Sequence, residues 1–335
     1  MEKLPAQMTV VGISKPGGPE VLLPETRSVP TPGPGEILVK VRTAGLNRAD
    51  LLQRSGFYPQ PGPKHDDEIP GLEFAGEVAA LGHGTEGFVA GDRVMGILAG
   101  RGHAEYLATH ASLAVKVPDN LSWTQAAAVP EAFITANDGL EQCHTAEGET
   151  VLVHAVGSGV GLAAVQVARL YGASTVIGTA RSVDKLERAG QFKLDATINS
   201  QEEDFADRVA ELTAKKGADV ILDLVGAAFL EQNIKAAALK GRIVTIGLVG
   251  GLRAELNLGL VLAKRLELRG TVLRSRSLAE KAAATRSFSH RVLAALASGQ
   301  VVPVIDSVYP MGEVSEAHKR MEANANFGKI VLEVG

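Results

Sequence analysis

A glycine-rich turn near the middle of the chain has residue types and spacing that suit the binding of a phosphate group. Residues 153–161 read VHAVGSGVG, and a helix-forming run begins at Leu162. Glycines at such a turn let the backbone approach a pyrophosphate, whose charge is stabilised by free N–H groups and the helix dipole. The match to G-x-G-x-x-G is imperfect, since Val156 and Ser158 stand at the first two glycine positions. A purely structural β–α turn is the alternative interpretation of the candidate residues Gly157, Ser158, Gly159, Val160 and Gly161.

The segment after the next predicted strand indicates which dinucleotide the turn would bind. An NAD site usually places an acidic residue there, about twenty residues beyond the turn, against the ribose hydroxyls. This chain instead has Thr179, Ala180 and Arg181, with Lys185 one helical turn further. A guanidinium can bind a 2′-phosphate through paired hydrogen bonds and a hydroxyl can add another, whereas a carboxylate would repel it. The sequence therefore predicts NADP(H); the alternative is that Arg181 and Lys185 are solvated residues at the start of a helix.

The turn belongs to a series of alternating strands and helices. From about Glu131 onward, apolar strand-like runs alternate with helical runs, and six strand candidates lie between Val151 and Leu273. This alternation predicts a parallel sheet covered by helices on both faces, a doubly wound α/β architecture. Such sheets bind their ligands at the carboxyl ends of the strands.

The rest of the chain has a different pattern. Residues 9–118 contain short strand-like runs broken by Gly and Pro, which predict a small barrel or sandwich. A long helix over 277–298 and a last strand over 330–334 have no partner in the alternating series, so we expect this tail to return to the first domain. The predicted division is therefore 1–131, 132–276 and 277–335.

Composition and charge fit a folded protein with two cores. Of 335 residues, 45% are hydrophobic and 21% are charged, and this length suggests two domains. The 34 basic and 38 acidic side chains leave a net charge of -4, and no basic tract is present. This balance argues against a nucleic acid as a partner.

The cysteine content and the apolar runs indicate in which cellular compartment we expect the protein. Cys143 is the only cysteine, so neither an internal disulfide nor a thiolate zinc site is expected, and a cytoplasmic location is predicted. Residues 151–168 carry no Asp, Glu, Lys or Arg, but their glycines favour a strand, a turn and a buried helix over a membrane span. The N-terminus lacks the apolar core of a signal peptide. We therefore predict no membrane partner and no targeting segment.

Five segments of the chain resemble one superfamily, and they are residues 44–54, 71–78, 125–131, 273–276 and 316–324. The chain resembles the medium-chain dehydrogenases/reductases and, among them, the zinc-free quinone oxidoreductases related to zeta-crystallin, especially the p53-inducible type. The resemblance implies a GroES-like β-rich catalytic domain and a Rossmann domain with a six-stranded parallel sheet. It also implies a homodimer joined through the cofactor sheets near the sixth strand, with a tetramer as the alternative.

The chain departs from the zinc alcohol dehydrogenases of the same superfamily at the metal ligands. Those relatives carry a cysteine near the position of Asn47 and a Gly-His-Glu motif where residues 71–73 read Gly-Leu-Glu. The eight histidines show no close pair at helical ligand spacing, and the acidic run 65–68 in a Pro-rich loop suits a solvated surface. We therefore expect no metal, and hydride delivery from the nicotinamide to an acceptor that is already electrophilic.

The resemblance also implies the residues of the catalytic site. Tyr58 would line the substrate cleft and orient an acceptor oxygen or donate a proton, although it could be a packing aromatic. Asn47 would lie near the nicotinamide ribose, although it could be a turn residue. Thr135 would face the cofactor, although it could be a back-bonded helix threonine. The other implied cofactor contacts are Ser200, Val225, Gly226, Gly247, Leu248, Leu273, Arg274, Ser275 and Asn326.

These observations predict an NADPH-dependent oxidoreductase that transfers hydride to a quinone without a metal. An enone or 2-enoyl thioester reductase shares the scaffold and is the alternative enzyme. A third alternative is an NADPH-binding structural protein with little turnover. The expected partners are a small-molecule quinone or enone and a second copy of the chain.

Overall fold

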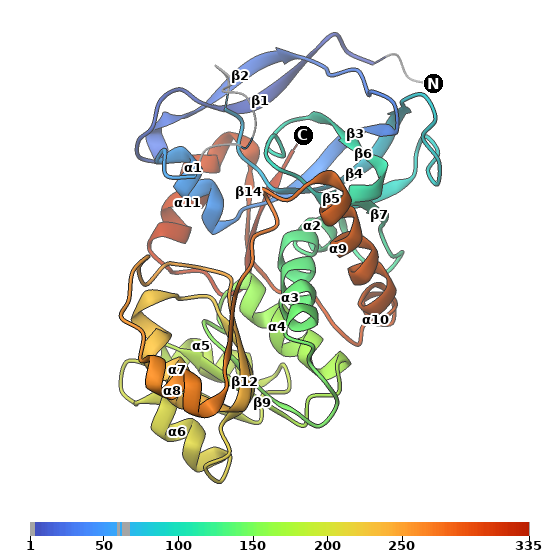
Figure 1. The fold of residues 1–335 in the computed structure, drawn as a ribbon. Coiled ribbons are helices and arrows are strands. Elements are labelled where there is room, and N and C mark those ends of the chain that lie inside the picture. The colour runs from blue at the N-terminus through green and yellow to red at the C-terminus, as the bar shows by residue number, and fades with distance from the viewer. Residues whose placement is uncertain (1–3, 59–60, 62–67, 335) are drawn as a thin grey trace. The chain divides into compact units, whose positions relative to one another are not determined.

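The computed structural model describes residues 4–58, 61 and 68–334 and divides the chain into two compact units (Figure 1). Unit 1 comprises Met1–Glu131 and Arg274–Gly335, and unit 2 comprises Ala132–Leu273. The second boundary lies before Arg274, whereas the sequence predicted it after Arg276. The reason is that the Arg274 guanidinium is hydrogen-bonded to residues of unit 1.

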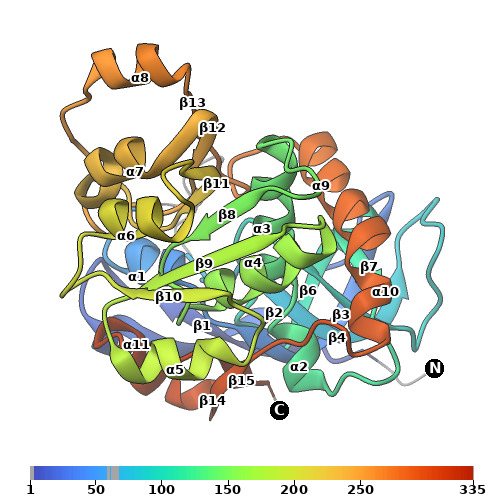
Figure 2. The same cartoon turned by 90° about the horizontal axis from the view of Figure 1, so that it is seen from below.

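Unit 2 contains the predicted six-stranded parallel sheet (Figure 2). The strand order is β10-β9-β8-β11-β12-β13, so the chain starts in the middle of the sheet and builds outward in both directions. The strands are β8 (Thr150–Val153), β9 (Thr175–Ala180), β10 (Ala196–Asn199), β11 (Ala218–Asp223), β12 (Ala237–Thr245) and β13 (Glu267–Gly270). The residues 151–168 are β8, the glycine turn and most of α4. No helix in the described residues is long and apolar enough to cross a membrane.

Helices cover both faces of this sheet because successive strand residues point to opposite sides. Ile221 and Ile243 pack with Phe205 and Val209 of α6 on one face. Gly139 of α3 approaches the side chains of Leu222, Val244 and Ile246 on the other face. The helices are α3 (Pro130–Gln142), α4 (Gly159–Leu170), α5 (Val183–Gly190), α6 (Phe205–Leu212), α7 (Leu230–Ala236) and α8 (Leu258–Lys264).

Most of the short strands of unit 1 join one seven-stranded sheet. Its long strand β3 pairs with β4 along its length, with β6 at its first half and with β15 at its end. The order is β14-β15-β3-β4-β5-β7, and β1 and β2 form a separate antiparallel pair. The strands are β1 (Gln7–Ile13), β2 (Leu22–Ser28), β3 (Glu36–Gly45), β4 (Glu73–Leu81), β5 (Arg93–Ile97), β6 (Tyr106–His110), β7 (Ala114–Lys116), β14 (Ile305–Pro310) and β15 (Lys329–Glu333).

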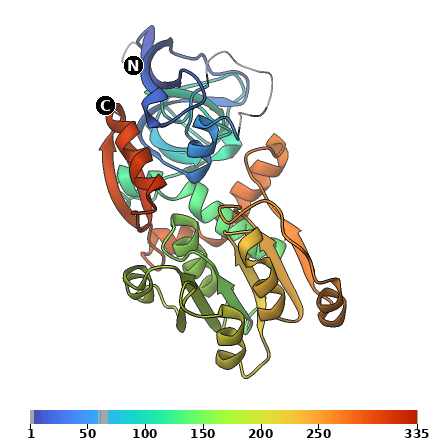
Figure 3. The same ribbon diagram turned by 90° about the vertical axis from the view of Figure 1, so that its left-hand side faces the viewer.

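The C-terminal tail completes the core of unit 1 (Figure 3). Ile330 and Leu332 of β15 pack against Val39 and Phe74, and Met321 of α11 lies in the same cluster. The helix predicted over 277–298 is broken at Val292, where φ is −110° and ψ is −31°. The helices of this unit are α1 (Arg48–Arg54), α2 (Trp123–Ala127), α9 (Leu278–Arg291), α10 (Leu293–Ala297) and α11 (Val314–Glu322).

Candidate functional site

The glycine turn lies between β8 and α4 at the carboxyl edge of the parallel sheet. Ser158 is the N-cap of α4: its oxygen accepts a hydrogen bond from the Gly161 amide at 3.1 Å, and its hydroxyl donates to the Ala155 carbonyl at 2.8 Å. A Cβ at Gly161 would lie 2.4 Å from that carbonyl oxygen, closer than any side chain can approach. Glycine is therefore required where the helix begins.

The residues of this edge fit a bound dinucleotide. The amides of Gly159 and Val160 lie in the first turn of α4, where the helix itself offers no acceptor. With the dipole of α4 they can hold a pyrophosphate. A Cβ at Gly157 would lie 2.7 Å from Cδ of Lys185. The structure thus places the alkyl chain of Lys185 over the turn.

His154 and Thr179 lie beneath the turn rather than in it. Both side chains are 0% exposed, and Nδ1 of His154 lies 2.8 Å from Oγ1 of Thr179. Nε2 of the ring lies 2.6 Å from Oδ1 of Asn233, and burial lowers the pKa of His154 to about 4. The Thr179 hydroxyl is therefore bonded inside the unit and cannot reach a 2′-phosphate, which differs from the prediction.

The end of β9 carries the residues predicted to select the cofactor. The strand ends at Ala180, and Arg181 follows with an exposed side chain. Ser182 is the N-cap of α5, and within the described residues its side chain makes no capping hydrogen bond. A hydroxyl and a guanidinium thus stand together at the positive end of a helix, where an anion is stabilised. Ser200, after β10, is next to them, with its amide 3.0 Å from the Ala180 carbonyl.

The ends of β11 and β12 meet at the same edge. The side chain of Asp223 accepts hydrogen bonds from the amides of Val225 and Gly226 at 2.8 and 2.9 Å, which fixes the loop after β11. Gly226 has φ 85°, and a Cβ there would lie 2.8 Å from the Leu248 side chain. The predicted contacts after β11 and after β12, including Gly247, therefore lie side by side.

Unit 1 contains a polar cluster in which the half-buried Asn47 meets the buried Glu73 and Lys329. Nζ of Lys329 donates to Oδ1 of Asn47 at 2.6 Å and forms an ion pair with Glu73, whose side chain is 0% exposed. Nδ2 of Asn47 donates to Oε1 of Glu73 at 2.8 Å. The Asn47 backbone amide also donates to Oδ2 of Asp50 at 2.7 Å, at the start of α1. Asn47 is thus a helix-capping residue whose side-chain amide is held in one orientation.

Tyr58 is held by Arg274. The guanidinium lies 4.8 Å from the centre of the phenol ring, a cation–π distance, and Nη1 donates to the Tyr58 carbonyl at 2.7 Å. The other donors bond to Gln53 and to the Ala99 carbonyl at 2.7 and 2.8 Å. Arg274 was predicted as a cofactor contact. Its side chain instead contacts the loop that carries Tyr58, because Arg274 is the first residue of unit 1 after the chain leaves unit 2. Burial raises the pKa of the Tyr58 phenol, and Arg274 opposes this rise.

Glu131 lies beside the same polar cluster. Its backbone amide, in the first turn of α3, donates to Oε2 of Glu73 at 2.8 Å. Burial and then the Glu73 carboxylate raise the pKa of Glu131 to about 8, while Lys329 and Arg274 lower it.

Three charged residues of this cluster were not predicted as site residues. Glu73 and Lys329 each begin a strand and are followed directly by apolar residues, and Glu131 follows an apolar run in the first turn of a helix. A charge at the boundary of a buried element was a usable signal, because buried charges are rarely found without a partner. The sequence could not predict that Glu73 contacts both Glu131 and Lys329.

The remaining predicted residues are dispersed. Thr135 lies within α3 and is 8% exposed. Leu273 is buried and Ser275 is exposed, at the junction where the chain leaves unit 2. The side chain of Asn326 is 9% exposed and its Nδ2 donates to the Gly328 carbonyl at 2.9 Å, so its amide is bonded to its own loop.

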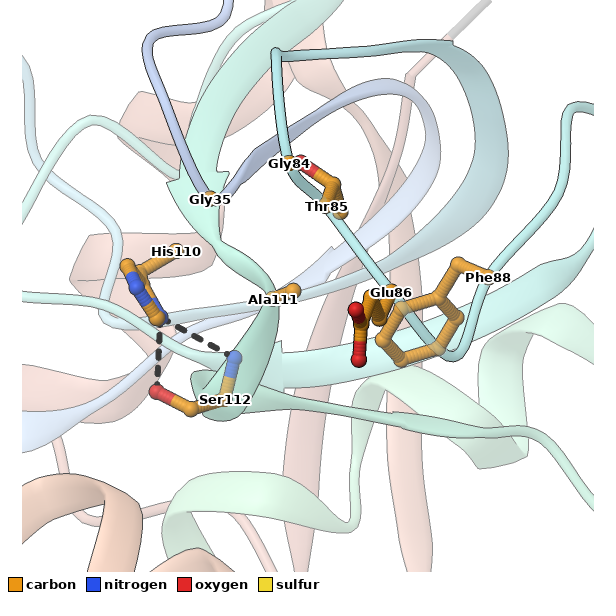
Figure 4. Close-up of a pocket in the computed structure, with 8 residues that line it drawn as sticks. All are labelled: Gly35, Gly84, Thr85, Glu86, Phe88, His110, Ala111 and Ser112. Atoms are coloured by element: carbon orange, nitrogen blue, oxygen red, sulfur yellow. Dashed lines mark hydrogen bonds between the residues drawn. The ribbon is translucent and has the colours of Figure 1, made fainter.

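Within the described residues, neither a metal cluster nor the pocket of unit 1 adds to the site. Among the residues that the structure describes, no group of His, Cys, Asp and Glu is arranged to hold a metal ion. The acidic run 65–68 lies mostly outside the described residues. A pocket of about 350 Å³ in unit 1 contains no predicted site residue (Figure 4), and its lining residues are Gly35, Gly84, Thr85, Glu86, Phe88, His110, Ala111 and Ser112.

Comparison with known proteins identifies this arrangement. Residues 33–134 match the alcohol dehydrogenase GroES-like domain family, and residues 159–288 match the zinc-binding dehydrogenase family. These matches define an oxidoreductase with a GroES-like and a Rossmann domain, which confirms the predicted fold. The chain belongs to the medium-chain dehydrogenase/reductase superfamily, among homologues of quinone oxidoreductases. The likeness to the p53-inducible type stays a prediction.

Individual relatives cover almost the whole chain. A quinone oxidoreductase of Homo sapiens is 31% identical over 97% of this chain and 97% of its own length. A solved structure described as an NAD-dependent alcohol dehydrogenase is 35% identical, with a TM-score of 0.87 over 98% of this chain and 100% of that chain. Mycobacterial Rv1454c in complex with NADPH is 30% identical, with a TM-score of 0.86 over 97% of this chain and 100% of that chain.

Proposed function

We propose that this protein is an NADPH-dependent reductase that transfers hydride to a quinone without a metal. The observation that carries the cofactor assignment is the end of β9. The Arg181 side chain is exposed there, next to Ser182, whose side chain makes no capping hydrogen bond within the described residues. The last residue of the strand is Ala180 and not an acidic residue. A 2′-phosphate is the ligand that such a group of donors favours.

The cofactor would be held by the edge of unit 2. The first-turn amides of α4 would bind the pyrophosphate, and Arg181 with Ser182 would bind the 2′-phosphate. The loops at Val225–Gly226 and Gly247–Leu248 would lie along the adenosine and its ribose. Bound NADPH would supply the hydride. A mycobacterial relative was solved with NADPH, which supports this assignment.

A quinone is the proposed acceptor because of the relatives and of the site chemistry. The human relative carries the name quinone oxidoreductase. Where the zinc alcohol dehydrogenases have a metal ligand, the Asn47 amide is engaged by Lys329 and Glu73. A quinone needs no metal to polarise its carbonyl, and the Tyr58 phenol can orient its oxygen.

We also propose that the protein is a homodimer joined at β13. This strand is the edge of the parallel sheet, and an unpaired edge is a template for another chain. The segment that leads from β12 into this strand carries exposed apolar side chains, with Leu252 at 81%, Leu258 at 68% and Leu262 at 79%. A second copy would cover these side chains and the strand edge together.

Initial rates of NADPH oxidation test the proposed function. The acceptors are an ortho-quinone, a para-quinone and a 2-enoyl thioester, each repeated with NADH and after treatment with a metal chelator. Quinone turnover with NADPH preferred and unchanged by chelation supports the proposal. Thioester turnover without quinone turnover would replace the substrate class. Binding of NADPH without turnover on any acceptor would favour a structural protein.

A further inference from the structure

The part of unit 2 from Leu248 to Gly270, which we call the outer segment, differs from the rest of its sheet in burial. In the described part of the chain, none of its residues is buried. Apolar side chains are nevertheless frequent, and Val249 is 63% exposed. Strands of a parallel sheet are normally covered on both faces, but Leu268 of β13 is exposed. The outer segment therefore has little buried surface to hold it in one conformation.

The helix α8 belongs to this segment and is apolar on two sides. Leu260 and Val261 pack against the core of unit 2. Leu258 and Leu262 are one helical turn apart, so they share one face of the helix, and both are exposed. A helix that shows apolar side chains to solvent, next to others that are packed, is typical of a surface that a partner covers.

The partner that fits this surface is a second copy of the chain. β13 is the last strand of the sheet, and within the described residues it pairs only with β12 (Figure 2). A twofold axis would pair β13 with its copy in antiparallel orientation. With the axis at Leu268, Glu267 of each copy lies opposite Arg269 of the other, and opposite charges across two strands stabilise their pairing. The edge of β13 is therefore complementary to itself.

The outer segment is also hydrogen-bonded to the loop after β11, which would lie along the adenosine. The Gly250 amide donates to the Val225 carbonyl at 2.7 Å, and the Ala228 amide donates to the Gly250 carbonyl at 3.2 Å. The Leu248 side chain packs closely over Gly226, where an added Cβ would lie 2.8 Å from it. The conformation of this loop thus depends on that of the outer segment.

We propose that dimerisation and NADPH binding are coupled through the outer segment, because the adenosine side of the cofactor site is complete only in the dimer. This inference rests on the proposed function, which places the adenosine against the loops after β11 and β12. A second copy orders the outer segment, and the outer segment orders the loop after β11. The dimer then binds NADPH more tightly than the monomer, because the loop is already ordered. By linkage, NADPH must stabilise the dimer in return.

The experiment measures cofactor binding and dimer dissociation in the full-length protein. L262E places a charge on the exposed face of α8, and L23E, at an exposed position of β2 in unit 1, is the control. Fluorescence titration gives the Kd of NADPH and of NADH at protein concentrations above and below the dimer dissociation constant. Sedimentation velocity gives that constant with and without NADPH. Circular dichroism checks that each variant is folded.

A second set of variants tests the pairing of β13 and serves if L262E does not fold. E267R places like charges opposite each other in the dimer, and E267R/R269E restores opposite charges with the two exchanged. The two side chains also form an ion pair within one chain, at 2.6 Å. The measured quantities are therefore the oligomeric state and the Kd of NADPH, and not the thermal stability.

The expected results are linked to one another. L262E and E267R are monomers that bind NADPH and NADH about 10-fold more weakly than the wild-type dimer, whereas L23E behaves as wild type. Since a dimer binds two cofactors, saturating NADPH lowers the dimer dissociation constant of wild type by the square of that ratio, about 100-fold. E267R/R269E is a dimer again and regains the tighter binding.

Three results would decide between the inference and the proposed function. A folded, monomeric L262E or E267R that binds NADPH as tightly as the wild-type dimer would refute the coupling and leave the proposed function intact. A wild type that is monomeric at every concentration would refute the interface and the coupling together. A wild type that shows the coupling but reduces no acceptor would support this inference and refute the proposed reductase activity.

Discussion

At the scale of single residues, two charged sites of the molecule differ in their exposure. In unit 1 the charges of Glu73 and Lys329 are buried and satisfied by each other and by Asn47. In unit 2 the guanidinium of Arg181 is exposed at the start of a helix. A buried pair fixes geometry, because removing either partner leaves an uncompensated charge. An exposed cation at a ligand edge is free to meet an anion.

Replacing Arg181 by alanine is expected to change cofactor preference. The variant loses a bond to a charged group, so binding of NADPH weakens relative to NADH by about 1.5–3 kcal/mol, which is about 10- to 150-fold. Fluorescence titration of each cofactor measures the two Kd values. Arg188→Ala is the control, since Arg188 lies on the same helix and pairs with Asp184. Equal weakening of both cofactors in the Arg181 variant would refute the assignment.

His154 is expected to make the protein sensitive to acid. Its pKa is about 4 in the folded protein, below the ordinary value of 6.5, so the unfolded chain binds a proton that the folded one does not. The stability from the neutral ring is complete above about pH 6.5 and is lost as the pH falls toward 4. Wild type should therefore lose about 3 kcal/mol more than His154→Gln over that range.

Urea unfolding at a series of pH values measures this difference. The exposed His83, replaced by Gln, is the control and should follow the wild-type curve. A gap between wild type and the His154 variant that stays constant with pH would contradict the account.

At the scale of elements, the helix α4 owes its position to one glycine. Gly161→Ala puts a Cβ 2.4 Å from the Ala155 carbonyl oxygen, so the turn must shift. We expect a loss of about 1–3 kcal/mol in stability and weaker binding of NADPH and NADH alike. Gly190→Ala is the matched control, because no atom of the described residues lies within 4 Å of the added Cβ, apart from its chain neighbours and its own helix backbone. If the Gly161 variant binds both cofactors as wild type does, the turn does not hold the pyrophosphate.

The order of strands and helices in unit 2 could be read from the sequence, because apolar strands alternate with helices and β8 leads directly into a glycine turn. The six-stranded parallel sheet was predicted and is present. The direction of single side chains could not be read. The strand pattern does not tell whether the Thr179 side chain points into the unit or toward a ligand. Only the structure shows its bond to His154. Arg274 was placed with the cofactor because the family resemblance implied a contact after the sixth strand, whereas the boundary of unit 2 lies three residues earlier than predicted, before Arg274.

At the scale of the whole molecule, the chain returns to its first unit after leaving unit 2. β14 and β15 join the sheet at β3, and Lys329 at the start of β15 completes the cluster with Glu73. The return of the tail could be predicted, because no strand of the alternating series was left to pair with it. The ion pair between positions 73 and 329 could not, since sequence patterns carry no information on such distant partners.

The proposed dimer predicts that a charge on α8, the helix that precedes β13, separates the two copies. Leu262→Glu puts a carboxylate on α8 at a side chain that is 79% exposed in the single chain. Sedimentation velocity should give a dimer for wild type and a monomer for this variant. Leu23→Glu, at an exposed position in β2 of unit 1, is the control and should stay dimeric. A wild-type protein that sediments as a monomer would refute the proposed interface.

The central claim is that the protein passes hydride from NADPH to a quinone, and single-turnover kinetics test it most directly. Metal-depleted protein saturated with NADPH is mixed anaerobically with excess quinone, and the loss of NADPH absorbance is followed. The same reaction is run with NADPH that carries deuterium at the transferred position. We expect one equivalent of NADPH to be oxidised, faster than without protein, and more slowly when deuterated. Oxidation no faster than in buffer, or a rate recovered only when zinc is added, would contradict the account.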